Sequence, residues 1–422
     1  MLSGLPTEVA FVVLLFGLFV VPRMLQRYRM PSAMTALVFG AVAGMGFGLL
    51  QGDPIVSLLS TLGIVALFLF AGLEVQAAEL YRERRVLIEH VVIRVFSLVA
   101  AMLVLAWVSQ RLPEAWGLAL DNRSSALVAL ALLTPSTGFI LDSIGRWGLT
   151  EEEQFWIRSK AIATELIALA VLFIVLQSTS AARLSLSALA ILAMIAVLPA
   201  VFRWFASAVV PHAPNSEFGF LMMVAAACAI VTRELGVYYL VGAFAVGMAA
   251  QQFRRQMPAE ASDRMFGAVE AFASLFVPFY FFHAGLELQR EDLGLAALGM
   301  GLAFTLVANP FRLVLVMLHR FIRLGERPSQ SLRVGVSMLP TTVFTLVIAE
   351  ILRTPQFEIS PVIFGGLIVY TLINTVIPGF ILRERTQDVP DEFFFGKTEP
   401  PFSLPRREPP GIQVSGGHPP KH

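Results

Sequence analysis

The chain contains 422 residues, of which 56% are hydrophobic and 14% are charged, with a formal net charge of +1 at pH 7. Soluble domains carry about 25% charged residues, so this composition excludes a soluble enzyme, and the near-neutral charge gives no indication of nucleic-acid binding. The single cysteine, Cys228, excludes an intrachain disulfide. Apolar stretches of roughly 20 residues, the length that spans a lipid bilayer, predict an all-α polytopic membrane protein.

Apolar runs separated by Arg, Pro, Gly or acidic clusters predict thirteen transmembrane helices. We place them at about residues 7–22, 31–50, 56–75, 86–108, 124–144, 157–177, 185–205, 217–232, 237–253, 267–288, 293–318, 333–352 and 360–382. The first run lacks a small-residue cleavage pattern, so we read it as a retained span. Residues 383–422 are polar and rich in proline, which predicts a disordered tail after a transmembrane domain covering 1–382.

Arginines in the connections predict the orientation, because basic residues are retained on the cytoplasmic side. One set of alternate connections holds fifteen arginines and the other holds six. The basic set includes the connection after the last span. We therefore expect the N-terminus outside and the C-terminus in the cytoplasm.

Two motifs occur twice in the same order. Phe68–Val75 reads FLFAGLEV and Phe281–Leu288 reads FFHAGLEL, with an offset of 213 residues between their glutamates. Pro135 and Pro340, each followed by hydroxyl residues, are separated by 205 residues. In both cases the copies lie seven predicted spans apart, an odd number, so they cross the membrane in opposite directions. The sequence predicts two inverted-topology repeats, at about 31–180 and 237–382.

Pro135 and Pro340 lie near the middle of the fifth and twelfth spans. Proline removes a helical hydrogen bond, and neighbouring hydroxyl groups can satisfy the freed carbonyls. A proline kink explains either span alone. Two such breaks at symmetry-related positions predict instead a crossing of two unwound helices, where exposed carbonyls and half-helix ends can coordinate an ion.

Glu165 is the clearest ionisable side chain inside a span. It lies eight residues after the predicted start of the sixth span, about 12 Å along the helix axis. A buried carboxylate can hold either a proton or a cation and exchange one for the other. The alternative is a structural salt bridge to a nearby arginine.

Other polar groups lie in or near the spans. Asn309 and Arg312 lie midway along span eleven, and Arg94 has the comparable place in span four. These arginines are candidates for balancing buried acids or for purely structural pairing, since arginine stays protonated. Lys160 is expected to snorkel towards the cytoplasmic surface, and Glu350, nearer a span end, is expected to be paired or solvated.

These features together resemble the cation:proton antiporter superfamily, especially the branch of Kef-type potassium/proton and bacterial sodium/proton exchangers. The similarity covers about residues 5–382. It implies a fold of thirteen helices with a dimerisation domain and a core domain that moves like an elevator. It also implies a homodimer in a bacterial inner membrane, exchanging sodium or potassium for a proton without a cofactor.

The resemblance assigns site residues by position. Glu165 takes the place of the family's essential aspartate, which binds the ion and the proton competitively, and Thr164 that of its polar neighbour. The unwound stretches are matched by Thr134, Ser136 and Thr137 in span five and by Thr341 and Thr342 in span twelve. Electrogenic relatives have two adjacent acids in span six, where this chain has Thr164 and Glu165. They also have a lysine in span eleven, where this chain has Asn309 or Arg312. Because Glu165 is the single titratable acid of the pair, the sequence predicts electroneutral exchange. Kef-type members also carry a nucleotide-binding domain, which we do not expect in the tail.

Three other functions stay open. A sodium-coupled carrier of organic anions could use Arg94 or Arg312 as a carboxylate anchor. A non-transporting sensor or channel could retain the fold. An intramembrane enzyme is disfavoured, because the sequence has neither His-Glu-x-x-His nor Gly-x-Ser-x-Gly.

Overall fold

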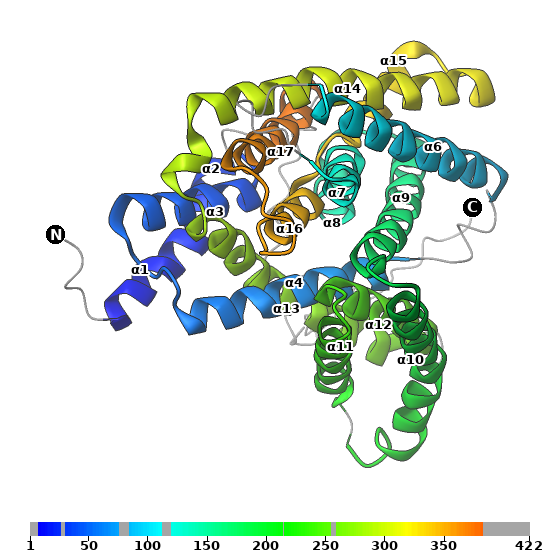
Figure 1. The fold of residues 1–422 in the computed structure, drawn as a ribbon. Coiled ribbons are helices and arrows are strands. Elements are labelled where there is room, and N and C mark those ends of the chain that lie inside the picture. The colour runs from blue at the N-terminus through cyan, green and yellow to red at the C-terminus, as the bar shows by residue number, and fades with distance from the viewer. Residues whose placement is uncertain are drawn as a thin grey trace, which may run out of the picture.

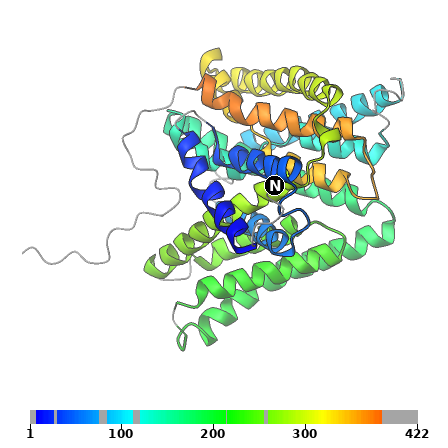
Figure 2. The same cartoon turned by 90° about the vertical axis from the view of Figure 1, so that its left-hand side faces the viewer.

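The computed structural model describes residues 7–26, 30–75, 84–111, 120–213, 215–254 and 259–382, and these residues contain helices and no strand. The predicted tail, 383–422, lies outside the described residues. Most helices run roughly parallel or antiparallel to one another, as expected of spans that cross one bilayer (Figure 2).

Helices occupy all thirteen predicted spans. The first half contains α1 (Thr7–Phe19), α2 (Val21–Gln26), α3 (Ser32–Ala41), α4 (Pro54–Leu73), α6 (Arg84–Ser109), α7 (Asn122–Leu133), α8 (Thr137–Ser143), α9 (Glu151–Gln177) and α10 (Ala181–Ala208). The second half contains α11 (Glu217–Glu234), α12 (Tyr239–Arg254), α13 (Ala259–Leu286), α14 (Leu295–Leu324), α15 (Pro328–Ser337), α16 (Thr342–Leu352) and α17 (Pro361–Ile381). A π-helical turn, Val42–Gly46, extends α3. Two 3-10 turns follow α8 and precede α14, at Ile144–Arg146 and Arg290–Leu293 respectively.

The spans differ in length and apolarity. Within the described residues, eight helical segments are long and apolar enough to cross a membrane, or up to nine with the bent pair α15–α16. Three further apolar helices are shorter, at Phe11–Leu25, Ser32–Gly46 and Tyr239–Gln251. Helix α11 carries Arg233 and Glu234 in its last turn, so its apolar part is short.

The helices pack in two groups. One group contains α1–α4 and α10–α13, in which α4 packs against α12 and α13, and α13 packs against α3. The other contains α6–α9 and α14–α17, in which α14 packs against α15 and α17 and α7 packs against α6 and α16. Figure 1 shows α10–α12 on the opposite side of the molecule from α14 and α15. We call these the scaffold group and the core group.

The repeated Gly-Leu-Glu motif has a packing role. A Cβ on Gly72 would lie 2.4 Å from the carbonyl oxygen of Phe244 in α12, and one on Gly285 would lie 2.1 Å from that of Leu37 in α3. Only glycine allows this close approach of two backbones. The contacts α4–α12 and α13–α3 are related by the predicted repeat. The inverted repeat is therefore visible in the packing as well as in the sequence.

Candidate functional site

The fifth and twelfth spans are both interrupted, and the two interruptions touch. Helix α7 ends at Leu133 and α8 begins at Thr137, while α15 and α16 are bent by 46° at their break. The backbone N–H of Ser136 donates to the carbonyl oxygen of Pro340 at 2.8 Å. In addition, Oγ1 of Thr345 donates to the carbonyl oxygen of Ala131 at 2.8 Å. The predicted crossing of two unwound helices is confirmed.

Glu165 of α9 lies beside this crossing. Its side chain is buried, and Oε2 has no hydrogen-bond partner within the described part of the chain. It shares a narrow space with Ser136 and Gly138 from the first break and Val343 and Phe344 after the second, a space with no room for a water molecule. None of the ion pairs between described residues includes Glu165. A lone buried carboxylate is costly when charged, so it favours a bound proton or cation.

Two hydroxyl groups of span five, those of Ser136 and Thr137, lie next to Glu165. Thr137 is the polar neighbour of the Glu165 carboxyl group. The hydroxyls of Thr134 and Thr137 are buried and have no hydrogen-bond partner among the residues described. Oγ of Ser136 accepts only a long hydrogen bond, 3.4 Å, from the N–H of Val343. The hydroxyl oxygens of Ser136 and Thr137 and the carboxylate form a set of hard oxygen ligands suited to a small cation.

The hydroxyl groups of span twelve are already paired. Thr341 and Thr371 share a hydrogen bond of 3.2 Å, and Thr342 and Thr375 share one of 2.6 Å. Both pairs join α16 to α17. Thr341 and Thr342 therefore lie at the crossing but would have to give up these bonds to bind an ion.

Arg312 of α14 holds the broken span twelve together. It donates to the carbonyl oxygens of Leu339, at 3.0 Å, and Met338, at 2.5 Å. It also donates to the hydroxyl of Tyr370 at 3.1 Å, and that hydroxyl donates to the carbonyl of Leu132 at 2.5 Å. Carbonyls at a helix C-terminus carry partial negative charge. Arg312 and Tyr370 thus satisfy the free ends of both half-helices, α7 and α15.

The other predicted site residues lie outside the Glu165 space. The hydroxyl of Thr164 donates to the carbonyl of Lys160 at 2.8 Å and contacts Nε2 of His90 at 3.0 Å. The amide of Asn309 donates to that of Asn374 at 2.7 Å. Arg94 is buried, and its Nε has no hydrogen-bond partner in the described residues.

A cluster of buried basic groups lies next to Thr164, and sequence reasoning missed it. Lys160 has no exposed surface, and its Nζ lies 3.3 Å from Nδ1 of His319. Nε2 of His319 lies 3.6 Å from Glu89, which is also paired with Arg323. The prediction that Lys160 snorkels is wrong, because its side chain turns inward towards α14. The signal in the sequence was weak, since these residues come from three separate helices.

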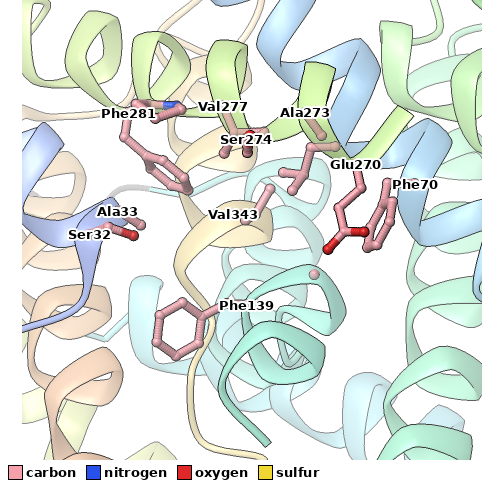
Figure 3. Close-up of a pocket in the computed structure, with 13 residues that line it drawn as sticks. Ser32, Ala33, Phe70, Phe139, Glu270, Ala273, Ser274, Val277, Phe281 and Val343 are labelled. Atoms are coloured by element: carbon pink, nitrogen blue, oxygen red, sulfur yellow. The ribbon is translucent and has the colours of Figure 1, made fainter. Parts of the chain in front are cut away.

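A cavity leads from the protein surface towards Glu165. It measures about 110 Å³ and lies between α3, α4, α8, α13 and α16 (Figure 3). Three of its lining residues, Leu67, Gly138 and Val343, also line the narrow space around Glu165. Among the described residues, Glu270 is the one acidic or basic side chain that lines it, and its carboxylate points into it (Figure 3). This passage opens on the predicted cytoplasmic face.

A family model described as "Sodium/hydrogen exchanger, transmembrane" matches residues 11–385. The chain belongs to the sodium/hydrogen exchanger family. The members of this family are transporters and not enzymes, and membership supports cation/proton antiport. No protein of curated function shows significant sequence similarity to the chain.

Solved structures support the same fold. The sodium proton antiporter MjNhaP1 from Methanocaldococcus jannaschii, at pH 8, superposes with a TM-score of 0.65 at 13% identity. That match covers 89% of this chain and 95% of MjNhaP1. A structure of the same antiporter in a 3D electron-microscopy map gives a TM-score of 0.61 at 14% identity, with the same coverage of 89% and 95%. At this identity the similarity establishes the fold.

Proposed function

We propose that the protein exchanges a monovalent cation for a proton, and that Glu165 binds either one. The observation that carries the proposal is the isolation of the Glu165 carboxylate, which is buried without an ionic partner beside two broken helices. A cation bound there would neutralise the carboxylate, and so would a proton. The two therefore compete for one position, and this competition couples their movements.

The transported cation is sodium or potassium. Oxygen ligands from Ser136, Thr137 and Glu165 suit either ion, and the Kef-type resemblance includes potassium. One proton leaves as one monovalent cation binds, because the described site contains a single titratable acid. Exchange is therefore electroneutral.

Alternating access occurs by an elevator motion of the core group against the scaffold group. The passage of Figure 3 runs between these two groups, with α4 and α13 on one side and α8 and α16 on the other. A shift of the core group along this boundary would move Glu165 away from the passage. The protein works as a homodimer in a bacterial inner membrane, with the N-terminus outside.

The organic-anion carrier is the less favoured alternative. It needs a free cationic anchor for a carboxylate, and one of its two candidates, Arg312, is engaged by two backbone carbonyls and Tyr370, which leaves Arg94 alone. The Arg312 guanidinium therefore has little capacity left for a substrate.

Transport by reconstituted protein tests the proposal. Liposomes with a trapped pH dye receive a pH gradient, and then sodium, potassium or lithium is added in turn. The wild type should respond to at least one cation, and Glu165→Gln should not. Glu152→Gln is the matched control, because Glu152 is an exposed acid in the first turn of the same helix. Cation flux that carries net charge would contradict electroneutral exchange, and a response that needs an organic solute would favour the anion carrier.

A further inference from the structure

The break in span five is held in place by side chains from the second repeat. Helix α7 ends at Leu133, and the last carbonyl groups of a helix have no partner within it. The carbonyl oxygen of Ala131 accepts a hydrogen bond from Oγ1 of Thr345 at 2.8 Å. That of Leu132 accepts one from the hydroxyl of Tyr370 at 2.5 Å. Two successive carbonyls of α7 are therefore bound by hydroxyl groups of α16 and α17.

The extended segment after α7 has a fixed backbone and free side-chain oxygen atoms. The N–H of Ser136 donates to the carbonyl oxygen of Pro340 at 2.8 Å, and the N–H of Thr134 donates to that of Leu130 at 3.0 Å. In contrast, the hydroxyls of Thr134 and Thr137 are buried and have no hydrogen-bond partner among the described residues. A ligand segment whose backbone is already fixed is preorganised, because little ordering is needed when an ion binds.

Tyr370 joins the two broken spans. Its side chain has no exposed surface, and its hydroxyl accepts a hydrogen bond from Nη1 of Arg312 at 3.1 Å while it donates to the carbonyl of Leu132. Arg312 also donates to the carbonyls of Met338 and Leu339 at the end of α15. A hydroxyl that accepts from a cationic group is polarised and donates more strongly. The end of α7 is thus tied to the end of α15.

A fixed backbone affects the choice among cations. Lithium, sodium and potassium carry the same charge, so a site distinguishes them by the size of its ligand cavity and by its flexibility. Thr137 lies beside Glu165 and follows the held carbonyls by a few residues. A loose segment could move its hydroxyl oxygen to fit any of these ions, whereas a fixed segment favours the ion that matches the spacing.

We propose that the hydroxyl groups of Tyr370 and Thr345 are positioning groups that set the cation selectivity of the Glu165 site. They bind no ion themselves. They fix the end of α7, and the fixed segment holds Ser136 and Thr137 at one spacing from the carboxylate. The inference rests on the proposed function, because it takes Glu165 as the place where the cation binds.

Equilibrium binding to the purified full-length protein tests the proposal. Lithium, sodium, potassium and rubidium compete with radioactive sodium or rubidium, and the measured quantity is the ratio of the affinities for the strongest and the weakest cation. Partial unfolding lowers both affinities equally and leaves this ratio unchanged. Tyr370→Phe and Thr345→Val each remove one hydroxyl and keep the side-chain shape. Each should lower the ratio about threefold, because one hydrogen bond to α7 is lost.

Thr371→Val is the matched control. Thr371 is as buried as Tyr370 and follows it in α17, but its hydroxyl shares a hydrogen bond of 3.2 Å with Thr341 of span twelve. This substitution also removes one buried hydrogen bond, and it leaves the carbonyls of α7 bound. The ratio should therefore stay as in the wild type.

Three results would overturn the inference. They are an unchanged ratio in a folded Tyr370→Phe or Thr345→Val protein, an equal fall of the ratio in Thr371→Val, and a wild type that binds all four cations with one affinity. Size-exclusion profiles and unfolding temperatures identify a variant that does not fold, and the other variant then decides the test. Failure of the proposed function has a different signature, because cation binding would then persist unchanged in Glu165→Gln.

Discussion

The two broken spans share a sequence pattern and differ in how their polar groups are satisfied. In span five, the hydroxyls of Thr134 and Thr137 are without partners among the described residues, and Thr137 lies beside Glu165. In span twelve, the hydroxyls of Thr341 and Thr342 are hydrogen-bonded to α17. Arg312 donates hydrogen bonds to the backbone carbonyls at this break. The two breaks of the inverted repeat therefore differ, because one leaves buried hydroxyl groups unpaired and the other is held by hydrogen bonds.

Removing Arg312 should destabilise the break in span twelve, and we expect this change to have the largest effect. Arg312→Met leaves the carbonyls of Met338 and Leu339 unsatisfied in a buried place, and we expect a loss of about 3 kcal/mol or more in stability. Thermal unfolding in detergent measures this loss. Arg183→Met, on an exposed position of α10, is the control. An unchanged unfolding temperature would mean that Arg312 does not hold the break.

Removing the Thr137 hydroxyl should weaken cation binding beside Glu165. Thr137→Val keeps the side-chain shape and removes one free oxygen beside Glu165. We expect the KM for the cation to rise about tenfold, with little change in unfolding temperature because the hydroxyl has no partner to lose. A loss of stability without a change in KM would mean that Thr137 stabilises the fold and does not bind the cation.

The equivalent change in span twelve should give the opposite result. Thr342→Val removes the hydrogen bond of 2.6 Å to Thr375. We expect the free energy of unfolding to fall by about 1 kcal/mol, the net value of one hydrogen bond. The KM for the cation should change less than twofold in the transport assay. If the KM of Thr342→Val rose more than that of Thr137→Val, the cation would bind to span twelve and not to span five.

A change in the passage of Figure 3 should have the smallest effect on transport. Glu270→Gln removes the one charged group that lines the passage within the described part of the chain, and this group acts only by raising the local cation concentration. We expect the KM on the predicted cytoplasmic face to rise about threefold at low ionic strength, and the difference to shrink in high salt, where charges are screened. A salt-independent effect would show that Glu270 binds the ion directly.

Much of the fold was predictable because its causes are local. Proline cannot continue a helix, so Pro135 and Pro340 reveal both breaks, and the Gly-Leu-Glu motif that occurs twice reveals the inverted repeat. Depth along an apolar run likewise identifies Glu165. These features need no knowledge of which helix lies beside which.

The remaining parts depend on neighbours that are distant in the chain. Lys160 meets His319 across 159 residues, and Tyr370 reaches the carbonyl of Leu132 across 238. Glu350 resembled an ordinary acid near a span end, until the structure placed it in a cavity with Glu287 and Tyr280. Side-chain pairing of this kind follows from packing, and one sequence does not determine it by pattern alone.

Proton release on cation binding tests the central claim most directly. Purified protein in weakly buffered solution, at a pH where the site holds its proton, receives sodium or potassium while a pH dye records released protons. The wild type should release close to one proton for each cation bound at the Glu165 site, and Glu165→Gln should release none. Equal proton release from both proteins would contradict Glu165 as the shared site of cation and proton.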